Sequence, residues 1–150
     1  MRIQATEQEL LLPEILIFAQ AAQDPTAQAR YRELQAAVRE GEVGDDLVGH
    51  LSNVLEIGLQ SGRLRRMYGA DGEQALVKLF HRTPAGAALS EEARAVTGAL
   101  AALQGQRVED IRISALGPGS YGLMIDTDRC QINVRLSRAG VSVENVAVGI

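Results

Sequence analysis

Residues 121–136, YGLMIDTDRCQINVRL, alternate between apolar and polar side chains and indicate the fold class most clearly. On both sides of the polar run 126–129, every second position is apolar: Tyr121, Leu123, Ile125, Cys130, Ile132, Val134 and Leu136. A period of two residues is typical of a strand with one buried face. The run Asp126-Thr127-Asp128-Arg129 has the composition of a turn. We therefore expect an antiparallel hairpin here.

The alternation continues before and after this hairpin. Apolar residues at 108, 111 and 113 precede it, and valines at 141, 143, 146 and 148 follow it. The alternation shifts phase at Glu144-Asn145, which indicates a β-bulge. The runs 117–120 and 137–140 are rich in glycine, proline and serine and predict turns. Because short connections join only antiparallel neighbours, residues 106–150 are predicted to form a four-stranded meander.

Residues 1–105 carry apolar residues at helical spacing and divide into about five helices. Side chains that can cap a helix N-terminus mark the expected starts: Thr6 with Glu9, Asp24 before Pro25, Asp45 or Asp46, Asp71 and Ser90. Pro13 either kinks the first helix or marks its first turn. Glycines or a proline mark the expected ends: Gly41, Gly62 or Gly69, Thr83-Pro84 with Gly86, and Gly105. The predicted fold class is α+β, with a helical region (1–105) packed on the antiparallel sheet (106–150) as one composite domain.

Composition excludes several classes of protein. The chain has 150 residues, 46% of them hydrophobic, which is typical of a folded globular chain. No apolar run reaches the roughly 18 residues that a membrane span requires, and the first residues lack the pattern of a signal peptide, so we expect a cytoplasmic protein. One cysteine and two histidines predict neither a disulfide nor a metal site. The net charge of −4 argues against a nucleic-acid binder.

Two motifs resemble functional ones, and neither predicts chemistry. Gly117-Pro118-Gly119-Ser120-Tyr121-Gly122 has the glycine spacing of a dinucleotide-binding loop. That loop must open a helix, whereas a strand follows here, so we interpret it as a turn. Cys130 lies on the apolar face of a predicted strand and is interpreted as a buried hydrophobic residue. A nucleophilic cysteine would need His81 or His50 as its base.

Charge is distributed unevenly along the chain. Residues 1–60 carry a net charge of −6, whereas residues 61–82 carry +3. The cationic candidates for a ligand or partner site are Arg63, Arg65, Arg66, Lys78, His81 and Arg82. One interpretation is a site for an anion or an acidic partner, since guanidinium groups bind carboxylates and phosphates in bidentate fashion. The other is a network of internal ion pairs with the acidic first 60 residues, which offer Glu33, Glu40, Asp45, Asp46 and Glu56. The adjacent blocks of opposite charge favour this second interpretation.

The sequence therefore predicts a non-catalytic interaction or assembly protein that acts through protein–protein contacts. It contains no recognisable catalytic set, cofactor motif or metal cluster. We expect a protein partner or a homo-oligomer, and the valine-rich strand 141–150 is a candidate edge for pairing. The alternative is a small module that binds an anionic ligand through the arginine cluster. The weaker alternative is a small cysteine/histidine enzyme.

Overall fold

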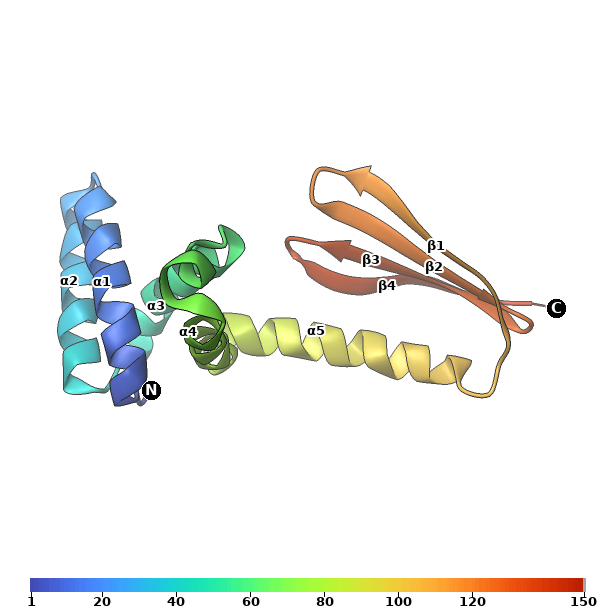
Figure 1. Ribbon diagram of the computed structural model, residues 1–150, viewed down its shortest axis with the longest axis horizontal. Helices are drawn as coiled ribbons and strands as arrows, with labels where there is room; N and C mark the ends of the chain where they lie inside the picture. Colours follow the sequence, from blue (N-terminus) through green and yellow to red (C-terminus); the bar gives the residue numbers. More distant parts are fainter. Residues whose placement is uncertain (150) are drawn as a thin grey trace. The chain divides into compact units, whose positions relative to one another are not determined.

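A computed structural model describes residues 1–149, and in this part of the chain five α-helices precede four β-strands (Figure 1). The helices are α1 (Ala5–Ala21), α2 (Pro25–Glu40), α3 (Asp45–Gln60), α4 (Arg63–His81) and α5 (Pro84–Leu100). A 3-10 turn, Ala101–Leu103, leads to the strands β1 (Val108–Gly117), β2 (Ser120–Thr127), β3 (Cys130–Ser137) and β4 (Gly140–Val148). The predicted α+β class is confirmed.

The chain forms two compact units, Met1–Ala87 and a second one that begins at Ala88. The first contains α1 to α4, and the second contains most of α5 together with the sheet. The single composite domain expected from the sequence stays a prediction.

The N-terminal cap predicted for α2 is confirmed, whereas the one predicted for α1 is not. Asp24 caps α2 as predicted, because its carboxylate accepts the N–H groups of Thr26 and Ala27. The capping box predicted at Thr6 and Glu9 is wrong, since the box of α1 is formed by Gln4 and Glu7. The Glu7 carboxylate accepts the Gln4 N–H at 2.8 Å. Glutamine is a weaker N-cap residue than threonine, so the residue type gave a misleading signal.

Pro13 lies inside α1, which continues on both sides of it. The first of the two predicted ends of α3 is confirmed, because α3 ends at Gln60 and Gly62 then adopts a left-handed conformation with φ 68°. Gly69 interrupts α4 with φ 71° and ψ −175°, a conformation that favours glycine.

The capping residues predicted for the last two helices are wrong. Gly69 divides α4 into two helical segments, so the short helix predicted after it is present, but Asp71 lies inside that segment and does not cap it. Ser90 lies inside α5, which begins at Pro84. Thr83 is the capping residue, since its buried hydroxyl accepts the Gly86 N–H at 3.2 Å. Proline at the first helical position starts a helix as readily as it ends one, which explains the error.

The core of the first unit lies between α1, α2, α3 and α4. Its fully enclosed members come from all four helices and the loop before α3: Leu11, Ile15, Leu34, Val38, Val43, Leu51, Leu55, Leu64, Leu76 and Leu79. Few aromatic rings contribute, so the helices pack through aliphatic side chains of moderate size. Phe18 and Tyr31 supply one ring contact at 5.7 Å between centroids.

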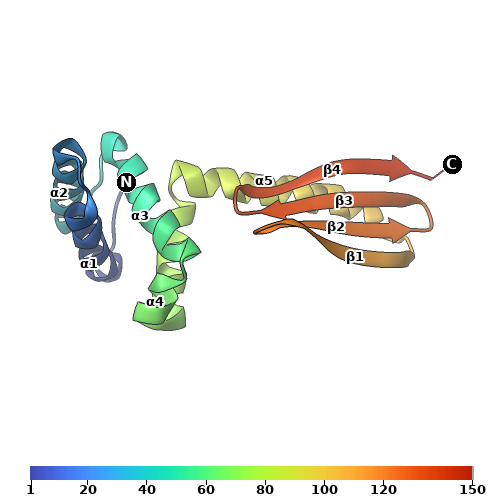
Figure 2. The same ribbon diagram turned by 90° about the horizontal axis from the view of Figure 1, so that it is seen from above.

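The sheet is the predicted antiparallel meander in the order β1-β2-β3-β4 (Figure 2). The bulge expected near Glu144 is confirmed, because Asn133 pairs with Asn145 and Val134 pairs with Val143, which leaves Glu144 as the extra residue. The glycine-rich segment 117–120 is the predicted turn between β1 and β2, with Gly119 at φ 70°. Consequently it cannot serve as a dinucleotide-binding loop, which requires a helix after it.

Helix α5 packs along one face of the sheet. Val96 lies against Cys130, Ile132 and Val134, so the core of the second unit is centred on β3. Partly buried neighbours complete it from α5 and the turn after it, and from the strands on each side of β3: Leu100, Leu103, Leu123, Val141 and Val143. Figures 1 and 2 both place α5 along β3 and β4 and away from β1.

Candidate functional site

Three of the six predicted cationic residues contact carboxylates within the first unit. Arg63 donates through Nε to Glu14 Oε2 at 3.0 Å, and Tyr68 donates its hydroxyl to Glu14 Oε1 at 2.7 Å. The Glu14 side chain is only 2% exposed, and its chain neighbour Ile15 belongs to the apolar core. A buried carboxylate requires a counter-charge and hydrogen-bond donors, and these two residues supply them.

This arrangement shifts the proton affinity of both donors. The hydrogen bond and the charge of Glu14 raise the pKa of Arg63 above its usual value. Burial raises the pKa of Tyr68 to about 12, and the hydrogen bond to Glu14 contributes in the same direction. At neutral pH Arg63 is therefore a guanidinium cation and Tyr68 is a neutral phenol.

A second buried carboxylate binds Arg82. Arg82 Nη2 lies 2.6 and 2.7 Å from the two Glu7 oxygens, and Nη1 donates to the Arg2 carbonyl at 2.9 Å. Arg65 lies 3.7 Å from Glu73 across the exposed surface of α4. The structure thus places Arg63, Arg65 and Arg82 in ion pairs of their own chain, and the pair partners of Arg63 and Arg82 come from the acidic N-terminal segment.

The remaining three candidates are not members of these ion pairs. Arg66 donates to the Ser61 carbonyl at 3.3 Å, and the ring of His81 contacts that of Phe80. Lys78 is exposed and forms no ion pair with another described residue. The break at Gly69 divides the candidates on α4 between a first segment, which carries the three arginines 63, 65 and 66, and a second segment, which carries Lys78 and His81.

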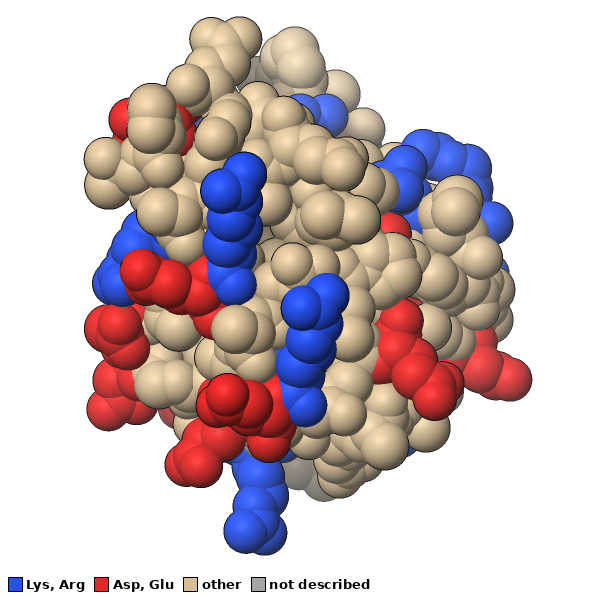
Figure 3. Space-filling model, turned by 90° about the vertical axis from the view of Figure 1, so that its left-hand side faces the viewer, with Lys and Arg blue, Asp and Glu red and all other residues tan. Residues whose placement is uncertain are grey.

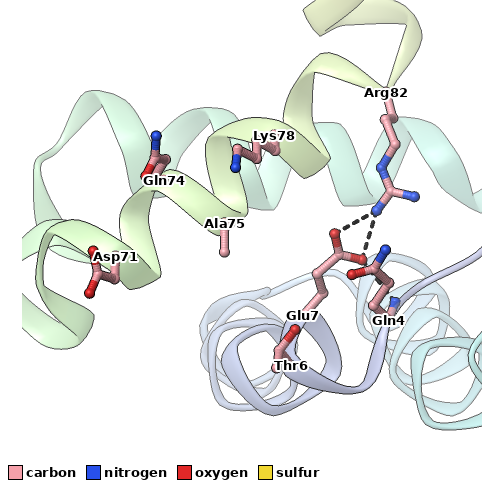
Figure 4. Close-up of a pocket in the computed structure, with 8 residues that line it drawn as sticks. All are labelled: Gln4, Thr6, Glu7, Asp71, Gln74, Ala75, Lys78 and Arg82. Atoms are coloured by element: carbon pink, nitrogen blue, oxygen red, sulfur yellow. Dashed lines mark hydrogen bonds and ion pairs between the residues drawn. The ribbon is translucent and has the colours of Figure 1, made fainter.

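Lys78 and Arg82 nevertheless share one pocket between the start of α1 and the second half of α4 (Figure 4). Its volume is about 370 Å³. The wall is polar and of mixed charge: Gln4, Thr6, Glu7, Asp71, Gln74, Ala75, Lys78 and Arg82. The dashed lines in Figure 4 show that Arg82 is directed at Glu7, so Lys78 is the cation available to a ligand there.

The surface formed by the first helices carries charges of both signs. Figure 3 shows lysine and arginine side chains next to aspartate and glutamate on this face, separated by uncharged areas. Arg30, for example, bridges Glu33 at 2.6 Å and Asp46 at 3.3 Å. Interspersed charges of this kind produce no extended field of one sign.

Cys130 is buried at the start of β3, as the sequence predicted. Its thiol lies 3.3 Å from Gln106 Oε1, and its N–H donates to the Thr127 hydroxyl at 2.9 Å. That hydroxyl lies 2.6 Å from the same glutamine oxygen. His50 and His81 both belong to the first unit, and His50 contacts the ring of Tyr31. Cys130 therefore takes part in a hydrogen-bond network that connects the start of β3 to the segment after α5.

The apolar face of the sheet is covered unevenly, which residue patterns do not predict. On β3, Ile132 is 0% exposed and Val134 is 2% exposed. On β1, Ile111 is 58% exposed and Ile113 is 68% exposed. The register pairs Ile111 with Ile125 and Ile113 with Leu123, so all four side chains share one face of the sheet. The strip Val108-Ile111-Ile113, which we call the β1 strip, is therefore the open end of a face that is closed over β3.

Geometry explains why one helix leaves this strip open. A helix with its side chains is about 10 Å wide. Strands are about 4.8 Å apart, so one helix covers about two strands. The second unit has four strands and one long helix among its described residues. A helix that lies along β3 and β4 consequently leaves β1 uncovered.

Comparisons of the chain with protein-family models, with curated proteins and with solved structures find no match in any of the three. Among residues 1–149, no helix combines the length and apolar character needed to cross a bilayer. Within the same residues, no group of three or more His, Cys, Asp or Glu side chains is arranged to hold a metal ion.

Proposed function

We propose that the protein is a non-catalytic interaction or assembly protein whose second unit binds another protein through the open part of its sheet. The observation that carries this proposal is the exposure of Ile111 and Ile113 on a face that is buried over β3. Exposed apolar residues on monomers are usually scattered singly, and contiguous strips mark interaction surfaces.

Burial of the β1 strip would supply useful binding energy. Each of Val108, Ile111 and Ile113 has half or more of its surface exposed. Complete burial of such a side chain is worth about 2 kcal/mol, so the exposed part contributes about 1 kcal/mol per residue. The strip also adjoins a free strand edge, whose unpaired backbone groups can hydrogen-bond to a partner strand.

The test compares the chain with the double variant Ile111→Ser, Ile113→Ser. Because both residues are exposed, the substitutions leave the unfolding midpoint nearly unchanged. We expect the wild-type chain to migrate in an assembly larger than one chain during gel filtration, either when purified or in cell extract, and the double variant to migrate as a monomer. A wild-type chain of monomer size in both preparations would refute the proposal.

A second candidate function is the binding of a small anion in the pocket between α1 and α4. It is favoured by the presence of Lys78 and Arg82 in one pocket and by the absence of a carboxylate partner for Lys78 among the described residues. Glu7 and Asp71 in the same wall oppose it, since like charges repel an anion.

Thermal shift with inorganic phosphate and with a dicarboxylate tests this candidate. A ligand at a hundredfold excess over its dissociation constant stabilises the folded chain by about 2.7 kcal/mol. The shift should disappear in Lys78→Gln and persist in Arg66→Gln, which changes a cation outside the pocket. Equal shifts in both variants, or none in the wild type, contradict the candidate.

A further inference from the structure

The geometry points to a second copy of this chain as the partner of the β1 strip, joined through antiparallel pairing of β1 with β1. This inference rests on the proposed function and names its partner. The two sheets would form one continuous sheet about a two-fold axis perpendicular to it. Both apolar faces would then lie on the same side, with the two β1 strips next to each other.

The edges of the sheet are not equally suited to pairing. β4, the edge expected from the sequence, is interrupted in its middle by the extra residue Glu144. A bulge bends a strand and breaks the regular ladder, so it protects an edge from pairing. In β1 the register shifts fall at Glu109 and Leu116, near the two ends of the strand. Between them, residues 110–115 run without interruption and contain both exposed isoleucines.

Charges on the other face of β1 select one register of self-pairing. Asp110 and Arg112 are neighbours on that face and lie 2.7 Å apart within one chain. With the two-fold axis at Ile111, Asp110 of each copy stands opposite Arg112 of the other. Cross-strand pairs of opposite charge stabilise a sheet, whereas like charges directly opposite destabilise it. An axis at Arg112 would place two guanidinium groups opposite each other and is disfavoured.

The same register also matches the apolar residues of the strip. Ile111 stands opposite Ile111 of the second copy. Glu109 is the extra residue in the pairing of β1 with β2, where Val108 stands opposite Thr127 and shares the face of Ile111. If Glu109 is also left unpaired in the pairing of β1 with the second copy, Ile113 stands opposite Val108 of that copy. All three residues of the β1 strip then acquire an apolar neighbour.

The test reverses the charge at Asp110 or at Arg112 and measures self-association by sedimentation velocity from micromolar to millimolar concentration. We expect the wild-type chain to form a dimer, and Asp110→Arg and Arg112→Asp each to weaken self-association about tenfold. An equimolar mixture of the two variants should recover the dimer, because each cationic strand then opposes an anionic one. A mixture that associates no better than the separate variants overturns the inference.

Two further variants keep the result interpretable. Ile113→Lys should weaken the dimer, whereas Val146→Lys, a matched change on the same face at the β4 edge, should leave it intact. Thermal unfolding of each variant confirms that it folds. A dimer lost in Val146→Lys and kept in Ile113→Lys refutes pairing through β1. A purified monomer that nevertheless migrates in a larger assembly in cell extract refutes the second copy as partner, while the proposed interaction function stands.

Discussion

The strands β3 and β1 belong to one sheet and carry the same kind of alternating sequence, yet most of the apolar residues of β3 are buried and those of β1 are exposed. Ile132 of β3 is enclosed by α5 and the neighbouring strands, whereas Ile113 of β1 points into solvent on the same face. The difference arises from coverage, since a single helix is too narrow for four strands. Alternation in a sequence therefore identifies an apolar face of a sheet but does not indicate which element covers that face.

The largest expected effect contrasts these two isoleucines directly. Ile132→Ala should lower the free energy of unfolding by about 2–5 kcal/mol, because it opens a cavity in the core of the second unit. Ile113→Ala removes atoms that are already largely exposed and should cost less than about 0.5 kcal/mol. Urea unfolding followed by circular dichroism measures both. Similar losses in the two variants would show that β1 is covered in solution.

A smaller effect is expected from the buried ion pairs of the first unit. Arg82→Ala leaves the buried Glu7 carboxylate without its counter-charge and should cost about 2 kcal/mol, a value reduced for the partial exposure of Arg82. Arg94→Ala is the matched control, since Arg94 and its partner Glu91 are both exposed. Chemical unfolding of the two variants should separate them. Equal stability would mean that the Glu7 carboxylate finds other donors or water.

The helix caps provide a third contrast. Asp24→Ala removes two hydrogen bonds to the start of α2 and should cost about 1 kcal/mol. Asp71→Ala should cost less, because the structure contains no capping bond from Asp71 to any described residue. Differential scanning calorimetry gives both values. A larger loss for Asp71→Ala would restore the capping role expected from its sequence position.

The smallest effect concerns pH. The pKa of Tyr68 is about 12 in the folded chain and about 10 when unfolded, so the folded chain holds the phenol proton more tightly. Its contribution to stability is complete below pH 10 and is lost as pH rises from 10 to 12. Absorbance of tyrosinate should therefore show one late component that is absent in Tyr68→Phe. Titration of all tyrosines near pH 10 in the wild type contradicts the assignment.

Sequence patterns predicted the meander, its turns and the bulge at Glu144, because each depends on neighbouring residues. They also predicted that the cationic cluster could pair with the acidic N-terminal segment, and Arg63 and Arg82 do so through Glu14 and Glu7. The partners expected from the sequence were wrong, because no ion pair in the described part of the chain joins a cationic candidate to Glu33, Glu40, Asp45, Asp46 or Glu56. Residues 1–60 contain ten acidic side chains. Which two of them pair with Arg63 and Arg82 depends on how the helices pack, and no local sequence pattern contains that information.

The capping residues of the last two helices were mistaken because Gly69 and Thr83-Pro84 are each compatible with the end of one helix and the start of the next. The open β1 strip was missed for a different reason. Coverage is decided by where α5 crosses the sheet, and that depends on Val96 and its contacts with β3 rather than on β1 itself. A comparison of strand number with helix number in the second unit could have indicated that part of the face would remain uncovered.

Hydrogen exchange of the β1 amides reports on pairing at this edge without any substitution. We expect the amides of residues 110–115 to gain protection as the chain associates, while those of the β4 edge exchange at an unchanged rate. Protection of β4 with β1 unchanged, or exchange from β1 that is the same in the free and the associated chain, would contradict pairing through β1.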